Sequence, residues 1–142
     1  MQFPYVAASV AAILIVLQQG LMLNTGLHRA RTGIGVGTGA DLHLERKMRR
    51  HGNLAENAAI FILVLALAEM LNPTSLVIVI LGGVFVVARV SHAVAFSSLT
   101  GSHGSENGSK AVVAARVVGS SGTALSGLVL GGYRGYLILT MA

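Results

Sequence analysis

Four long apolar stretches constrain the fold of this 142-residue chain more than any other feature of its sequence. A helix needs about 20 residues to cross the hydrocarbon core of a bilayer. Stretches of about this length run over residues 3–27, 46–71, 75–99 and 110–133. They predict an all-α integral membrane protein with four transmembrane helices, built as a single domain over residues 1–142.

The composition agrees with a membrane protein and narrows the possible functions. Hydrophobic residues make up 54% of the chain and charged residues 11%, whereas a soluble domain of this size needs more polar surface. Cysteine is absent, which excludes disulfides, thiolate metal sites and a cysteine nucleophile from this chain. The net charge of +5 comes from basic residues beside the apolar stretches, a pattern typical of membrane topology. We therefore expect contact with the lipid bilayer and no nucleic-acid partner.

Charged residues interrupt the second and third stretches. Only residues 57–68 separate Glu56 from Glu69, which is too short a segment to span a membrane. The second helix must therefore carry Glu56 into the membrane or its interface. Arg89 lies inside the third stretch. Charges within a membrane are costly and usually mark a functional site, so these positions are where we expect the function to reside.

The distribution of basic residues predicts the orientation of the chain. Residues 28–51 are rich in Lys and Arg, whereas the turn at residues 72–74 has none. Because Lys and Arg are retained in the cytoplasm, loops 28–51 and 100–109 are predicted to be cytoplasmic, with both termini outside. At about 1.5 Å per residue, Arg89 lies roughly 21 Å from the outer end of its helix. This depth matches that of Glu56 and of Arg116, near the start of the fourth helix.

Two sets of residues recur at helical spacing and share a helix face. The set on the second helix is Arg46, Arg49, Asn53 and Glu56. The set on the third helix is Arg89, His92 and Phe96. One interpretation is a buried ion pair between Glu56 and Arg89 that only holds the helices together. The alternative, which also explains the other polar residues, is an Arg-rich pocket with one carboxylate, open to the cytoplasm. Such a pocket suits a small ligand with carboxylates and an ammonium group.

Two segments carry a resemblance to a known family. Residues 49–57 read RRHGNLAEN and resemble the R-x-H-x-N-x-x-E-N signature of the MAPEG family, the membrane-associated glutathione transferases and eicosanoid-metabolising enzymes. Residues 88–96 read ARVSHAVAF and resemble that family's third-helix motif, in which Arg is followed by His and then by an aromatic residue. Together with the four spans, the resemblance covers nearly the whole chain.

The resemblance implies a left-handed four-helix bundle that assembles as a homotrimer. Glutathione, as co-substrate, would bind at each subunit interface near the cytoplasmic face. By motif position, its binding residues would be Arg46, Arg49, Asn53, Glu56, Arg89, His92 and Phe96. Arg116 would face the thiol as the catalytic residue. No metal is implied, and the sequence holds no H-E-x-x-H or comparable cluster.

The chemistry implied by the resemblance is activation of a thiol. A thiol with a pKa of about 8.5 is only slightly ionised at neutral pH, and the thiolate is the nucleophile. The guanidinium of Arg116 would favour the anion, and lowering the pKa by about two units corresponds to about 2.7 kcal/mol. The second substrate would be an apolar electrophile or hydroperoxide arriving through the lipid. We therefore expect a glutathione-dependent transferase or peroxidase in a bacterial inner membrane.

Three departures from the family pattern suggest a bacterial-type member and leave alternatives open. One of them is a long loop between the third and fourth stretches. Phe96 stands where well-studied members carry Tyr, and Ile60 stands where many carry Pro. A non-catalytic membrane trimer is therefore one alternative. A small transporter or channel lined by buried Arg and Glu is the other, although the charges cluster at one depth and do not continue across the membrane.

Glycines form two further patterns. Gly127 and Gly131 fit a G-x-x-x-G helix contact, either within the bundle or around the trimer axis. The glycines at alternate positions in residues 33–39 resemble a nucleotide-binding loop only superficially, because no strand precedes them. A flexible cytoplasmic loop is the favoured interpretation there.

Overall fold

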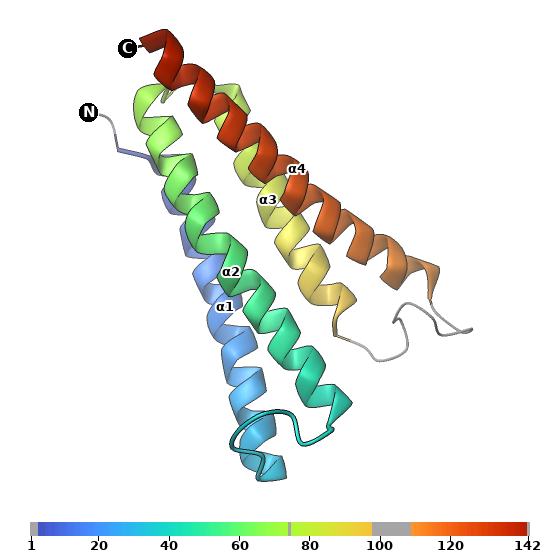
Figure 1. The fold of residues 1–142 in the computed structure, drawn as a ribbon. Helices are drawn as coiled ribbons and strands as arrows, with labels where there is room; N and C mark the ends of the chain where they lie inside the picture. Colours follow the sequence, from blue (N-terminus) through green and yellow to red (C-terminus); the bar gives the residue numbers. More distant parts are fainter. Residues whose placement is uncertain (1–2, 74, 98–108, 142) are drawn as a thin grey trace.

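The computed structural model describes residues 3–73, 75–97 and 109–141. Within them all regular structure is helical, in four helices shown in Figure 1: α1 (Tyr5–Thr32), α2 (Leu42–Leu71), α3 (Leu76–Ala95) and α4 (Lys110–Met141). Each helix is long and apolar enough to cross a membrane. The predicted all-α, four-helix class is confirmed.

The helix ends differ from the predicted spans. α1 continues to Thr32 and α4 to Met141, whereas α3 ends at Ala95, short of the predicted residue 99. The predicted spans were the apolar stretches that cross the hydrocarbon, whereas α1 and α4 continue as helices beyond these stretches. In α1, for example, Arg29 and Arg31 lie in the last turn, where cations complement the helix dipole. The predicted loop 100–109 falls almost entirely outside the described residues.

The four helices alternate in direction along the bundle. Figure 1 shows the start of α1, the α2–α3 turn and the end of α4 at one end of the molecule. The ends of α1 and α3 and the starts of α2 and α4 lie at the opposite end. This alternation is what the predicted topology requires. Which end faces the cytoplasm stays a prediction.

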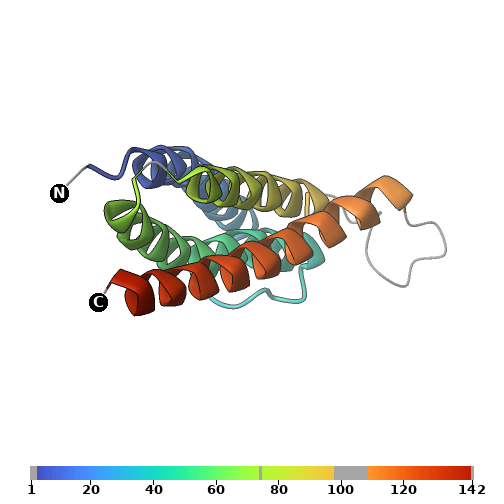
Figure 2. The same ribbon diagram turned by 90° about the horizontal axis from the view of Figure 1, so that it is seen from above.

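The helices pack as two pairs, with α1 beside α2 and α3 beside α4 (Figures 1 and 2). Glycine brings α4 close to α3. A Cβ atom on Gly119 would lie 2.7 Å from the backbone nitrogen of His92, and one on Gly122 would lie 2.9 Å from the Cβ of Ala88. Only glycine permits this approach, so the start of α4 is fixed against the end of α3.

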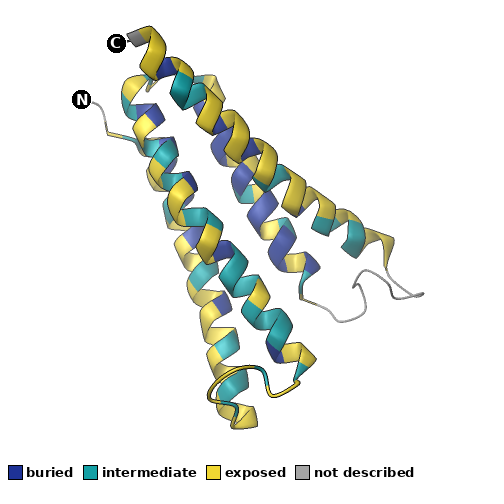
Figure 3. Ribbon diagram, in the orientation of Figure 1, coloured by how far each residue is buried: buried dark blue, intermediate teal, exposed yellow. Residues whose placement is uncertain are grey.

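Figure 3 shows the buried residues on the faces that the helices turn toward one another and the exposed residues on the outside. The most deeply buried side chains include Leu14, Leu65, Ile78 and Phe85. Large apolar side chains also cover the exterior of all four helices. An apolar exterior of this extent is expected for a protein whose surroundings are lipid.

Glu69 is buried at the end of the bundle that holds the termini. Its side chain is 3% exposed, and its two carboxylate oxygens accept hydrogen bonds from the backbone N–H groups of Val6 at 2.8 Å and Ala7 at 2.9 Å. These N–H groups belong to the first turn of α1 and have no partner within that helix. Glu69 of α2 is thus a cap for α1. Its anion also complements the positive end of the helix dipole.

Candidate functional site

Arg89 connects three helices at the centre of the site. It lies on α3 and is 3% exposed. Its Nη1 donates a hydrogen bond to Oδ1 of Asn53 on α2, at 2.5 Å. Its Nη2 donates to the backbone oxygen of Gly119 at 3.0 Å and to the hydroxyl of Thr123, both on α4. The guanidinium therefore reaches the second and fourth helices at the same level.

The ion-pair interpretation of Arg89 is wrong. Among the described residues the ion pairs are His28–Asp41 and Glu45–Arg49, and Glu56 is instead exposed. The acceptors on Arg89 are neutral, and its Nε is buried without a hydrogen-bond partner in the described part of the chain. A buried guanidinium held only by neutral groups keeps an uncompensated charge, which favours the binding of an anion beside it.

A cavity of about 340 Å³ lies between α2 and the end of α3. Its lining contains five of the predicted site residues, namely Arg49, Asn53, Glu56, His92 and Phe96, together with Met48 and Gly52. Polar and apolar side chains both contribute to the wall. The structure thus brings together the two faces that helical spacing had marked, one on each helix.

A second cavity, of about 540 Å³, adjoins the first. The two share Asn53 and His92, and the second extends along α4, where Ser120 and Thr123 line it. Arg89 also lines this second cavity. Asn53, which accepts a hydrogen bond from Arg89, is therefore part of the wall of both cavities.

Phe96 connects Arg116 to the first cavity. Its ring stacks on the ring of His92, with centroids 4.5 Å apart and planes inclined by 24°. The Arg116 guanidinium lies 4.8 Å from the centre of the same Phe96 ring. A guanidinium over an aromatic face is attracted by the ring quadrupole. The Phe96 ring therefore contacts both His92 on α3 and Arg116 on α4, and the two side chains lie at a similar level.

Arg46 lies less centrally than the other predicted residues. It is half-buried on α2, one turn before Arg49, and it does not line the 340 Å³ cavity. Its Nη1 is buried and has no hydrogen-bond partner within the described residues.

Thr123 and Gly119 are site residues that sequence reasoning missed. Both accept hydrogen bonds from Arg89. The signal was present, because Arg116, Gly119 and Thr123 follow one another at intervals of three and four and so share a face of α4. Thr123 carries no charge and lies among small residues, so nothing else in the sequence distinguished it.

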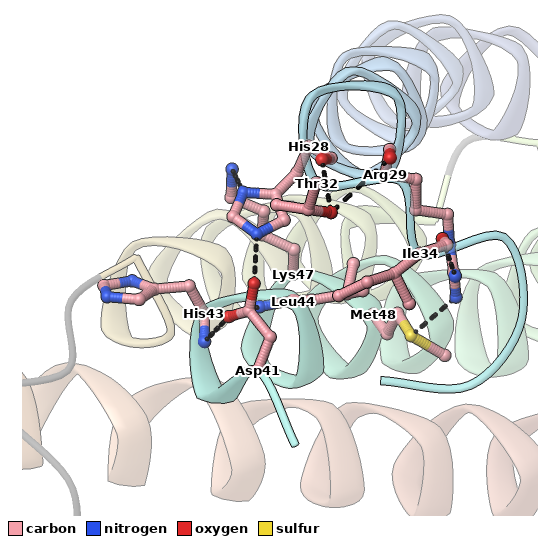
Figure 4. Close-up of polar contacts among 9 residues, drawn as sticks. All are labelled: His28, Arg29, Thr32, Ile34, Asp41, His43, Leu44, Lys47 and Met48. Atoms are coloured by element: carbon pink, nitrogen blue, oxygen red, sulfur yellow. Dashed lines mark hydrogen bonds and ion pairs between the residues drawn. The ribbon is translucent and has the colours of Figure 1, made fainter. Parts of the chain in front are cut away.

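A separate polar cluster joins the end of α1 to the start of α2 (Figure 4). His28 Nε2 lies 2.6 Å from Asp41 Oδ2, and Lys47 Nζ lies 3.1 Å from His28 Nδ1. The other Asp41 oxygen caps α2 by accepting from the backbone N–H groups of His43 and Leu44. The hydrogen bond with His28, followed by that with Leu44, lowers the pKa of Asp41 to about 2.

The glycine-rich loop between these helices is held in place. Gly33 ends α1 in the left-handed conformation, with φ of 72°, a conformation that glycine adopts without strain. Arg29 then donates hydrogen bonds to the backbone oxygens of Ile34 and Gly35, as Figure 4 shows for Ile34. The glycines thus allow the chain to turn at the end of the bundle, between α1 and α2. Within the described residues no strand precedes this loop, and no group of three or more His, Asp or Glu side chains forms a metal site.

The fold and the site together define a four-helix membrane protein with two adjoining polar cavities, one lined by Arg49 and the other by Arg89. A family model, that of the MAPEG family, matches residues 7–130, and the chain therefore belongs to the MAPEG family. This family includes membrane-bound glutathione transferases and related enzymes. Comparisons with curated proteins and with solved structures gave no match.

Proposed function

We propose that this protein is a membrane-bound glutathione-dependent transferase or peroxidase. The observation that carries the proposal is the buried Arg89 guanidinium, which has neutral partners only and lines a cavity that adjoins Arg49 and Glu56. Membership of the MAPEG family supports the same reaction class.

The charges of the cavity complement those of glutathione, which carries two carboxylates and one ammonium group. Arg binds a carboxylate through two parallel hydrogen bonds, and Arg49 and Arg89 are the candidates for this role. Glu56 is exposed in the cavity wall and accepts from the ammonium group. Asn53, whose oxygen is fixed by Arg89, presents its amide nitrogen as a further donor. The cavity volumes are of the size typical of small-molecule sites.

Arg116 is the proposed thiol-activating residue. Its guanidinium stabilises the thiolate electrostatically, and the thiol proton passes to water, so no protein base is needed. The thiolate sulfur then forms a bond to an electrophilic carbon, and the leaving group departs with its bonding electrons. With a hydroperoxide, the thiolate sulfur instead bonds to the terminal peroxide oxygen, the O–O bond breaks, and the alkoxide leaves and takes a proton from water. A second glutathione thiol then reacts with the resulting sulfenic acid, which gives glutathione disulfide and water. Phe96 supports this role of Arg116 through its ring and requires no hydroxyl.

The proposal includes a homotrimer in a bacterial inner membrane, with loops 28–51 and 100–109 in the cytoplasm. The support for assembly is a stripe along α2 with intervals of four and three, made of Arg49, Asn53, Glu56, Ile60, Leu63 and Leu67. Its apolar part is exposed, with Ile60 at 67%, Leu63 at 59% and Leu67 at 41%. This spacing is that of a helix seam that packs against other helices. The polar part of the stripe lines the cavity, so a neighbouring subunit would close it.

An ultraviolet difference titration with glutathione tests the function. Detergent-purified protein at neutral pH is expected to show a saturable thiolate absorption band. Arg116→Ala should abolish the band while calorimetry still detects glutathione binding. Binding without a band in the unaltered protein would instead identify a non-catalytic member. Absence of any saturable binding would remove the proposal, and solute flux in liposomes would then test the transporter alternative.

A further inference from the structure

The thioether of Met48 lies between the polar site and the end of α1. Met48 is half-buried on α2 and lines the 340 Å³ cavity. Its sulfur accepts a hydrogen bond from Nη2 of Arg29 on α1, at 3.0 Å, as Figure 4 shows. Met22 and Met70, by contrast, line neither polar cavity. Met48 therefore combines an oxidisable sulfur, a cationic hydrogen-bond donor and a place in the cavity wall.

A thioether reacts with hydroperoxides by oxygen transfer, which converts methionine into methionine sulfoxide. The terminal peroxide oxygen bonds to the Met48 sulfur, and the O–O bond breaks. The departing alkoxide takes the hydroperoxide proton and leaves as an alcohol. The sulfur is thereby oxidised by two electrons and the hydroperoxide is reduced. Because the chain contains no cysteine, this reaction does not compete with a protein thiol.

The Arg29 guanidinium favours this reaction at Met48. Negative charge develops on the oxygen that departs from the peroxide, and a hydrogen bond from a cationic donor stabilises such an oxygen. The Arg29 Nη2 already lies beside the sulfur. It is held there, because Nη1 of the same side chain donates to the backbone oxygens of Ile34 and Gly35. Exposure alone would instead predict that Met22, at 44% exposed, is oxidised first.

The oxygen of the sulfoxide is expected to lie in the polar cavity. The Met48 sulfur and the Arg29 nitrogen are already in contact at 3.0 Å, so an oxygen atom does not fit between them. The cavity is the open space beside the Met48 side chain. A sulfoxide oxygen there carries partial negative charge and faces the region that Arg49 makes favourable for carboxylates. Oxidation of Met48 therefore weakens the binding of a carboxylate ligand.

We propose that Met48 is a modification site, at which a hydroperoxide forms methionine sulfoxide and so lowers the affinity of the polar cavity for its ligand. The modification is reversible, because methionine sulfoxide reductases restore the thioether. Excess hydroperoxide thus inhibits the protein until the sulfoxide is reduced. The effect on ligand affinity rests on the proposed function, since glutathione is the ligand, whereas the oxidation of Met48 does not.

Peptide mapping tests the modification. Detergent-purified protein is treated with hydrogen peroxide for increasing times, and mass spectrometry measures the gain of one oxygen atom at each methionine. Met48 should be oxidised about fivefold faster than Met22, a ratio equivalent to one hydrogen bond. Equal rates, or faster oxidation of the more exposed Met22, would overturn the assignment.

The role of Arg29 is tested with the same assay. Arg29→Gln removes the cationic donor and should slow the oxidation of Met48 by about fivefold, the loss expected for one hydrogen bond, while the rate at Met22 stays the same. Arg31→Gln removes an exposed cation two positions along α1 and is the matched control, which should change neither rate. Unchanged or faster oxidation of Met48 in Arg29→Gln would contradict the role of the guanidinium.

Calorimetry with S-methyl glutathione, which has no free thiol, tests the effect on affinity. After oxidation and removal of the peroxide, affinity should fall about tenfold, as expected for a polar group left unpaired. Met48→Leu should keep its affinity through the same treatment, whereas Met22→Leu should lose affinity like the unaltered protein. Affinity that persists when Met48 is oxidised would overturn the inhibition. Absence of binding before treatment would remove the proposed function, and the peptide mapping would still decide whether Met48 is the modification site.

Discussion

At the scale of single residues, Arg89 is a buried cation whose hydrogen-bond acceptors are neutral, and it therefore gives the clearest prediction. Arg89→Met keeps an unbranched side chain of similar length and removes the charge. We expect glutathione affinity to fall by about thirtyfold, because a hydrogen bond to a charged group contributes about 2 kcal/mol. Isothermal titration calorimetry measures this loss.

The control for this variant is Arg31→Met, which removes an exposed cation at the end of α1. It should leave glutathione affinity unchanged. An equal loss in both variants would show that the net charge of the protein, rather than the Arg89 site, attracts the ligand.

Phe96 is the residue at which a role of the aromatic ring can be tested apart from a role of the hydroxyl that Tyr carries in well-studied family members. Phe96→Leu removes the ring that Arg116 stacks on, whereas Phe96→Tyr keeps it. A cation–π contact at a partly exposed site is worth about 0.7 kcal/mol, so the pH midpoint of thiolate formation should rise by about half a unit in Phe96→Leu. The thiolate band measured against pH reports this midpoint. A midpoint unchanged in Phe96→Leu would contradict the positioning role, and Phe96→Tyr should match the unaltered protein.

At the scale of elements, Asp41 couples the glycine-rich loop to the start of α2. Its pKa is lowered to about 2 from an ordinary value of 3.8, so its contribution is complete above 3.8 and is lost as the pH falls through about 2. Asp41→Asn imitates the protonated acid at neutral pH. We expect faster proteolysis within residues 33–41 in this variant. Glu45→Gln, which affects only a surface pair with Arg49, is the control and should leave the cleavage rate unchanged.

The helix elements were predictable from the sequence, and their rotation about their own axes was not. Apolar length and the cost of buried charge predicted four helices and the depth of Arg89. Which residue of α2 binds Arg89 depends on the rotation of α2 about its axis. In the structure this rotation places Asn53 against Arg89, rather than Glu56 one turn further along. For Gly127 and Gly131 the sequence predicted a contact either within the bundle or around the trimer axis. A Cβ atom on either glycine would meet no atom within 4 Å, so the first is wrong and the second stays a prediction, whereas the face turned to α3 carries Gly119 and Gly122.

At the scale of the whole molecule, the exposed stripe of α2 predicts the assembly. Leu63→Asn places a polar amide in the middle of the proposed seam, where it has no partner, and should weaken the trimer. Native mass spectrometry in detergent is expected to show monomers for Leu63→Asn. Leu139→Asn is the matched control and should leave the trimer intact, because Leu139 is 84% exposed near the end of α4 and lines neither polar cavity. Trimers that persist in Leu63→Asn would locate the interface elsewhere.

The cap on α1 also has a consequence for biosynthesis. The first turn of α1 takes its carboxylate from Glu69, more than sixty positions further along the chain. While the chain is being synthesised, α1 emerges from the ribosome long before its cap exists. Its terminal N–H groups must therefore be solvated by water or lipid headgroups until α2 has been inserted beside it. We therefore expect α1 and α2 to reach their final structure together as a helical hairpin, because α1 obtains its cap only once α2 has been inserted.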